Sequence, residues 1–104
     1  MSAQLCHPHR PAFASNDWSA GTDAEYKQEA SAYIAYTGEF QVDEEKGMLT
    51  HSMFVSLFPN WMGQTQPRVV KLEGDVLHLS TAVPMQSGGR AVYFFLKWQR
   101  AARN

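Results

Sequence analysis

The longest alternating stretch of the chain reads MLTHSMFVSLF, residues 48–58, and predicts a long β-strand. Alternate side chains of a strand point to opposite faces. One face therefore carries Leu49, His51, Met53, Val55 and Leu57, and the other carries Thr50, Ser52, Phe54 and Ser56. Because the first face is mostly apolar, we expect it to line a hydrophobic interior. A one-residue change of register would exchange the two faces, so the pattern alone does not fix which one points inward.

Shorter strand segments lie on both sides of this stretch. The polar sequence DEEKG, residues 43–47, precedes it, and PNWMG, residues 59–63, ends it. A tight Glu73-Gly74-Asp75 turn predicts a hairpin between two later strands, and residues 84–89 are interpreted as a flexible loop. The expected strands are residues 1–6, with weak strand character, then 36–42, 48–58, 68–72, 76–83 and 91–99.

One helix is expected, and its signal is a capping box at Thr22-Asp23-Ala24-Glu25. In such a box the threonine hydroxyl accepts from the amide of Glu25, and the Glu25 carboxylate accepts from the amide of Thr22. Helical spacing of apolar residues continues to Ile34, so the helix is predicted to run to about Ala35.

Short strands with hairpin-length connections indicate an antiparallel meander. The expected fold class is therefore mostly β, an antiparallel barrel or partly open barrel with one α-helix. A chain of 104 residues has room for a single domain over residues 1–104. Hydrophobic residues make up 44% and charged residues 18% of the chain, which is typical of globular proteins.

Composition and charge exclude several function classes. A net charge of −1 argues against nucleic acid as a partner. No apolar run is long enough to span a membrane, and the N-terminus lacks the pattern of a signal peptide. The single cysteine, Cys6, forbids an internal disulfide, so a cytoplasmic location is expected. Neither Cys6 with His7 and His9 nor any other cluster has the spacing of a metal site, and no cofactor is predicted.

Motifs in several of these segments occur together in a fixed order and spacing. They are RPAFA (residues 10–14), YIAYTGEFQVD (33–43), TH (50–51), SLFPNW (56–61), LEGDVLHLST (72–81) and the closing segment from Gly88-Gly89-Arg90 to Trp98. In this order they resemble the bacterial and fungal lipocalin-like domain family. The resemblance implies a lipocalin-like antiparallel barrel with an enclosed pocket. The resemblance does not define an activity. Because some members of the family accompany biosynthetic enzymes, both carrying a small molecule and shaping its reaction stay open.

The chain departs from that family at its start. Such domains usually open with a further strand region containing Gly-x-Trp, whereas residues 1–5 here match a later strand. A small closed barrel needs about eight strands, and the sequence supplies five or six. We therefore expect an exposed edge at residues 1–5 or 91–99, covered by a second copy in a homodimer. A misassigned start of the chain is the competing explanation.

Candidate ligand contacts follow from the strand faces and their ends. His51 could hydrogen-bond a ligand or move a proton, or it could be a core histidine held by a neighbouring hydroxyl. Arg68 could bind a carboxylate or lie solvated at a rim. The remaining candidates are Met53, Val55 and Trp98 as lining of the cavity, Asn60 and Trp61 at a strand exit, and Tyr36 at the helix–strand junction. Each group also has a purely structural interpretation. The lining residues could be core packing, the strand-exit residues could cap a loop, and the Tyr36 hydroxyl could simply face solvent.

Three functions fit these residues. The first is binding of a small, largely apolar molecule in the cavity, with His51 and Arg68 as polar contacts. The second is a small isomerase, cyclase or dehydratase of a biosynthetic intermediate, with His51 or a tyrosine as acid or base, although no catalytic residue can be assigned. The third is a structural or interaction protein with a filled core.

Overall fold

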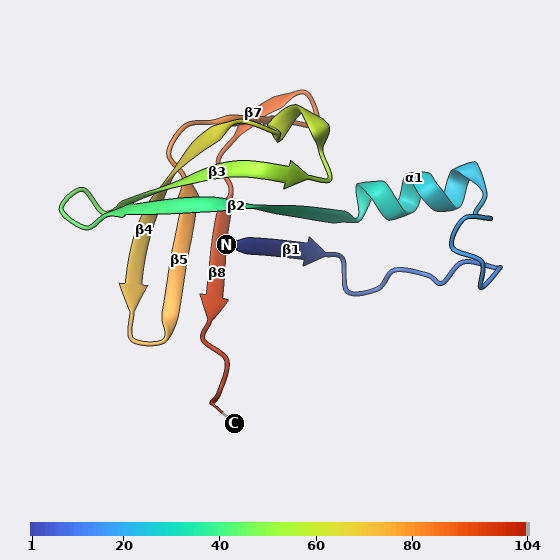
Figure 1. Ribbon diagram of the computed structural model, residues 1–104, viewed down its shortest axis with the longest axis horizontal. Coiled ribbons are helices and arrows are strands. Elements are labelled where there is room, and N and C mark those ends of the chain that lie inside the picture. Colours follow the sequence, from blue (N-terminus) through green and yellow to red (C-terminus); the bar gives the residue numbers. More distant parts are fainter. Residues whose placement is uncertain (104) are drawn as a thin grey trace. The chain divides into compact units, whose positions relative to one another are not determined.

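The computed structural model describes residues 1–103. Six strands form one antiparallel sheet in the order β1-β2-β3-β4-β5-β8, and two short strands, β6 and β7, form a separate ribbon (Figure 1). The elements in chain order are β1 (Ser2–Cys6), α1 (Asp23–Ser31), β2 (Tyr33–Asp43), β3 (Met48–Ser56), a 3-10 turn (Pro59–Trp61), β4 (Thr65–Glu73), β5 (Val76–Thr81), β6 (Met85–Ser87), β7 (Arg90–Val92) and β8 (Phe95–Gln99). The predicted fold class, mostly β and antiparallel with one α-helix, is confirmed.

The chain divides into two compact units. Unit 1 comprises Met1–Gly38 and Met53–Gly63, and unit 2 comprises Glu39–Ser52 and the residues from Gln64 onward. The strands β2 and β3 each contribute residues to both units.

The core of unit 1 forms where β1 pairs with β2. Ala3 stands opposite Tyr36 in this antiparallel register, and both are buried together with Met53. Met1, Leu5, Ile34 and Trp61 pack against this cluster. The amide of Leu57 donates to the carbonyl of Ala35 at 2.8 Å, which joins the end of β3 to β2 within the unit.

The helix begins as predicted and ends earlier than predicted. The Thr22 hydroxyl accepts from the Glu25 amide at 3.2 Å, and the Glu25 carboxylate accepts from the Thr22 amide at 2.9 Å. The prediction that α1 reaches Ala35 is wrong, because α1 ends at Ser31. The residues that follow are used as a strand instead, with Tyr33 opposite Cys6 and Ile34 opposite Leu5. Ladder pairing and core packing outweigh helical spacing there.

Unit 2 is built around the β4–β5 hairpin, with β8 beside β5 (Figure 1). The predicted hairpin forms, but Glu73 pairs with Val76 within the ladder, so the turn contains only Gly74 and Asp75 and is one residue shorter than predicted. Gly74 has φ of 59°, a conformation that glycine adopts without steric cost. The strand β4 is longer than expected, because it begins at Thr65 rather than at Arg68 and its first residues pair with β3. The strand β5 is shorter than expected, because it ends at Thr81 rather than at Val83.

Two expectations for the end of the chain are corrected. Residues 84–89 are not a loop throughout, since Met85–Ser87 forms β6 and pairs with β7 across Gly88 and Gly89. Both glycines have positive φ, which suits a two-residue hairpin turn. Residues 91–99 are likewise not one strand, because they divide into the end of β7 and β8. The break allows β8 to pair with β5 while β7 pairs with β6.

The long alternating strand keeps its predicted burial pattern only at its start. Leu49, His51 and Met53 are buried, in agreement with the sequence. Val55 is 64% exposed and Leu57 is also exposed, whereas Ser56, expected on the other face, is buried. The predicted face is therefore wrong beyond Met53. Two consecutive exposed residues shift the buried positions by one, as a register change does.

Candidate functional site

The buried face of unit 2 combines apolar and polar side chains. Across β3 and β4, His51 stands opposite Gln66 and Leu49 stands opposite Arg68. Across β4 and β5, Arg68 stands opposite Thr81. Residues that are directly opposite, or two apart along one strand, point to the same face of a sheet. All five of these side chains therefore share one face, and all five are buried.

Arg68 lies at the centre of this face and is only 6% exposed. Its Nη2 donates to the side-chain oxygen of Gln66 at 2.7 Å, and its Nη1 donates to the carbonyl of Pro67 at 3.1 Å. The Gln66 side chain in turn donates from Nε2 to the Gln64 side-chain oxygen at 2.9 Å. A guanidinium stays charged at any physiological pH, so this face holds a permanent buried positive charge.

His51 is 3% exposed and lies on the strand next to Arg68. Burial, and after it the positive charge of Arg68, lowers the pKa of His51 from 6.5 to about 4. Both effects disfavour the imidazolium. His51 is therefore neutral near pH 7, with one donor and one acceptor nitrogen on its ring.

Apolar side chains extend this face toward β8. Leu79 is buried and stands opposite Leu96, and Leu77 stands opposite Trp98. Leu96 and Trp98 are half-buried. Three candidate residues of the sequence analysis, His51, Arg68 and Trp98, thus lie on one face of unit 2.

The other candidates belong to unit 1. Tyr36, Met53 and Trp61 pack together, with the Tyr36 and Trp61 rings in an edge-to-face contact at 5.9 Å between centroids. Val55 and Asn60 are exposed on the surface. Whether any of these residues contacts a ligand stays a prediction.

Sequence reasoning missed two polar residues of the unit 2 face. Gln66 was outside the expected strand, and Thr81 was not singled out. For Thr81 the signal lay in the hairpin turn. Once Glu73 is paired with Val76, counting back along β4 and forward along β5 places Thr81 opposite Arg68. For Gln66 the signal was its spacing of two residues from Arg68, which puts both on one face.

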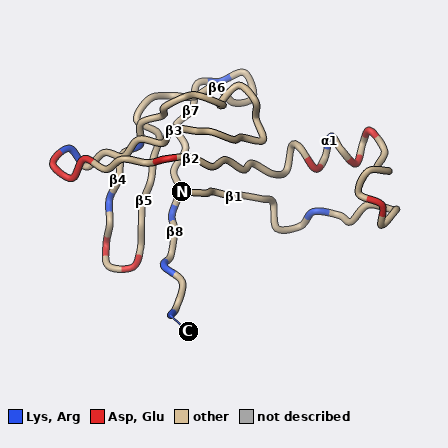
Figure 2. Tube along the Cα trace, in the orientation of Figure 1, with Lys and Arg blue, Asp and Glu red and all other residues tan. Residues whose placement is uncertain are grey.

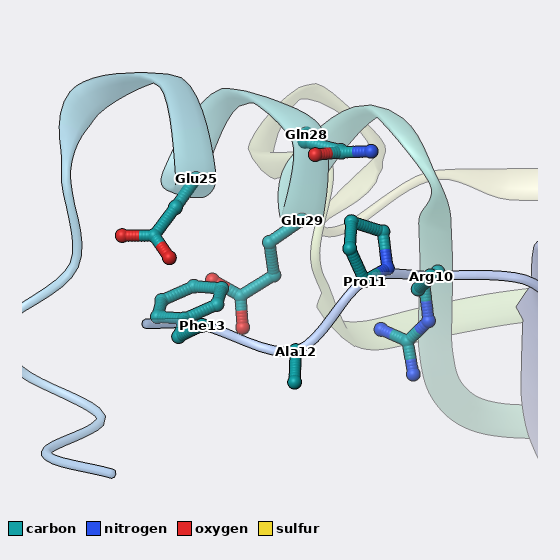
Figure 3. Close-up of a pocket in the computed structure, with 7 residues that line it drawn as sticks. All are labelled: Arg10, Pro11, Ala12, Phe13, Glu25, Gln28 and Glu29. Carbon is teal, nitrogen blue, oxygen red and sulfur yellow. The ribbon is translucent and has the colours of Figure 1, made fainter. Parts of the chain in front are cut away.

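A pocket of about 310 Å³ in unit 1 was also not anticipated (Figure 3). It lies between residues 10–13 and the first turns of α1, with Phe13, Glu25 and Glu29 in its wall. The Glu25 carboxylate accepts from the amide of Ala14 at 2.8 Å, and the Phe13 ring contacts Tyr26 edge-to-face. The hydrogen bond from the Thr22 amide, and after it the one from the Ala14 amide, holds the pKa of Glu25 below its ordinary value. The residues around the pocket thus fasten the loop to the helix.

Charged residues lie mainly on the turns and outer surfaces of unit 2. Figure 2 shows them gathered at the β2–β3 loop and at the β4–β5 turn. On the outer face, Lys71 forms an ion pair with Glu73 at 2.8 Å, and His78 lies 3.4 Å from the same carboxylate. Both pairs are solvent-exposed, and such pairs contribute little to stability.

Within residues 1–103, no three His, Cys, Asp or Glu side chains gather in a way that could hold a metal ion. None of the helices over the same residues is long and apolar enough to cross a membrane. The cytoplasmic location expected from the sequence stays a prediction.

Comparison with known proteins identifies the class. The lipocalin-like domain family matches residues 1–101, and the chain belongs to this family. A curated relative from Aspergillus oryzae (strain ATCC 42149 / RIB 40) is 36% identical over 109 residues, which cover 99% of this chain and 98% of the relative. That relative is named 4'-hydroxy-3'-methoxypropiophenone carrier protein ppsC. No solved structure matches this chain significantly.

Proposed function

We propose that this chain binds and carries a small, largely apolar molecule, with the buried face of unit 2 as the binding surface. The observation that carries the proposal is the burial of Arg68 beside His51 on an otherwise apolar face. Removing a guanidinium from water costs several kcal/mol, and an apolar residue of similar size is often at least as stable. A ligand with a polar group gives a reason for keeping this arginine in the interior.

The relative supports a chemical class for the ligand. Its name describes a propiophenone, an aromatic ketone with one hydroxyl and one methoxy group. An aromatic ring suits a face lined by Leu49, Leu79, Leu96 and Trp98, and its oxygen substituents suit His51 and Arg68. We therefore propose small oxygenated aromatic ketones as the ligand class, with binding rather than chemistry as the function.

The pKa of His51 favours carriage over catalysis. An effective general base has a pKa near the working pH. At about 4, the pKa of His51 makes the imidazole a weak base at pH 7. The alternative of an isomerase, cyclase or dehydratase with His51 as base is therefore the less favoured function.

Calorimetric titration with 4'-hydroxy-3'-methoxypropiophenone tests the proposal. We expect saturable binding with one site per chain and no change in the recovered compound. The variant R68M should weaken binding at least tenfold, because it removes the charged donor. The matched control K97M, at an exposed lysine of β8, should bind like the wild type. Absence of binding, equal binding by R68M, or turnover of the compound would contradict the proposal.

We further infer that two copies of the chain associate through β8. This strand ends the sheet order, and Phe95 on it is 80% exposed, with Tyr93 and Phe94 also exposed just before it. On β1, the other strand at an end of the order, Ala3 is buried and Leu5 half-buried. An exposed edge strand with large apolar side chains favours pairing with another chain.

Sedimentation equilibrium at micromolar concentration tests this association. The wild type should be a dimer, and F95K should be a monomer because a charge cannot be buried at the interface without a partner. The control Q86K, at an exposed residue of β6, should remain a dimer. A monomeric wild type would exclude the dimer.

A further inference from the structure

Arg68 makes the buried face of unit 2 electrostatically positive. Together with burial, which is the larger cause, this charge lowers the pKa of His51 on the neighbouring strand. Hydrogen bonds to the Gln66 side chain and to the carbonyl of Pro67 help to fix the guanidinium in place. A fixed charge in a buried site interacts more strongly with a ligand than the same charge in water.

The other ionisable side chains on the neighbouring strands of unit 2 are exposed to solvent, fully or in part. Lys71 and Glu73 each lie an odd number of residues away from Arg68 along β4, so their side chains point to the opposite face of the sheet. His78 of β5 stands opposite Lys71 and Lys97 on that outer face and is half-buried. The acidic residues of β2 in this unit, Glu39 and Asp43, are exposed to solvent. Among the described residues of unit 2, His51 and Arg68 are thus the ionisable side chains that are buried on this face.

We propose that the His51–Arg68 face binds a ligand hydroxyl of the phenol class as its anion, so that the protein lowers the pKa of its ligand. This inference rests on the proposed function. A phenol is neutral in water near pH 7 and costs less to remove from water than a carboxylate, which is already charged. Once it lies beside a guanidinium, its ionised form is the favoured one, as for any acid next to a fixed positive charge.

The proton balance of this step is simple. The O–H bond of the ligand breaks, its electron pair stays on the oxygen, and the oxygen accepts hydrogen bonds from the guanidinium. The proton leaves to solvent, because a pKa of about 4 prevents His51 from holding it near pH 7. Binding in the pH range between the bound and the free pKa of the ligand therefore releases one proton per chain.

The direction of the pH dependence follows from this release. Above the pKa of the free ligand, the affinity is high and constant. Below it, the affinity falls by about tenfold per pH unit until the pKa of the bound ligand is reached. Arg68 stays charged throughout this range, so the ligand's own hydroxyl sets the profile.

Absorbance spectra of the bound ligand test the inference directly. The probes are the hydroxylated propiophenone used above and its 4'-methyl ether, which has no proton to lose. At a pH about one unit below the pKa of the free hydroxylated probe, we expect the bound probe to show the red-shifted phenolate band. The methyl ether should bind without such a band. The variant R68K should keep the band and R68M should lose it, while K97M should match the wild type.

The outcomes separate this inference from the proposed function. If both probes bind and the hydroxylated one keeps the spectrum of a neutral phenol, the inference is overturned while the carrier function stands. If neither probe binds to the folded wild type, both are overturned. Should R68M fail to fold, the wild-type spectra and the number of protons released, measured by calorimetry in buffers of different ionisation enthalpy, decide the question.

Discussion

Arg68 donates a 2.7 Å hydrogen bond to the side-chain oxygen of Gln66, the residue that stands opposite His51 in the β3–β4 register. Strand alternation places Arg68 on the same face as the His51 imidazole, and this bond orients the guanidinium on that face. After burial, the charge of Arg68 is the next cause that lowers the pKa of His51 on the adjacent strand. A glutamine with no charge of its own therefore orients the permanent charge of the candidate site.

The burial of His51 predicts a stability that depends on pH. The pKa of His51 is about 4 in the folded chain against an ordinary value of 6.5, so between these values the unfolded chain binds more protons. The free energy of unfolding should thus fall as pH is lowered from 6.5 toward 4, by at most about 3 kcal/mol. Urea unfolding between pH 7 and 4.5 measures it.

The variant H51Q should lose most of this slope, since glutamine does not titrate. H9Q, at an exposed loop histidine, is the control and should keep it. An H51Q slope equal to that of the wild type would show that other groups cause the dependence.

The capping box at Thr22 is expected to stabilise α1. The helix has no buried residue, so its ends contribute much of what holds it together. The variant T22A should cost about 1 kcal/mol by removing the oxygen that accepts from the Glu25 amide. Faster amide exchange in α1 is the measurement. T22S retains a hydroxyl and should behave like the wild type; equal exchange in T22S and T22A would argue against the cap.

The close packing at Gly21 predicts a steric effect. A Cβ on this residue would lie 2.6 Å from Cε2 of Phe13 and 2.8 Å from Cζ of Tyr26. The variant G21A should therefore displace the Phe13 ring and destabilise the chain by roughly 1–3 kcal/mol. The smaller side chain in F13L should relieve part of that cost. A double-mutant cycle by thermal unfolding measures the coupling, and strict additivity would refute the contact.

Truncation of the buried Met53 side chain should destabilise unit 1 by leaving a cavity. It is 1% exposed and lies in the core cluster with Ala3 and Tyr36. The variant M53A should lower the free energy of unfolding by about 2–5 kcal/mol. M62A, at an exposed methionine of the same unit, should change it by no more than about 0.5 kcal/mol. Similar losses in both variants, measured by urea unfolding, would contradict the assigned core.

Two local signals in the sequence were interpreted correctly. The capping box at Thr22 and the turn at Gly74 each form as predicted. The chemistry of both is complete within a few residues, one through a hydroxyl and a carboxylate three positions apart and the other through a glycine with positive φ. The alternation of β3 also predicted the burial of His51 and Met53.

Only the tertiary structure decided which distant residues meet. Tyr33 leaves the helix because Cys6 pairs with it, and Val55 is exposed although it continues an alternating pattern. The site followed the same rule, since Arg68 was recognisable in the sequence but its partner Gln66 was not. Caps and turns depend on neighbours along the chain, whereas strand register and burial depend on partners many residues away, and one sequence contains no direct signal for those partners.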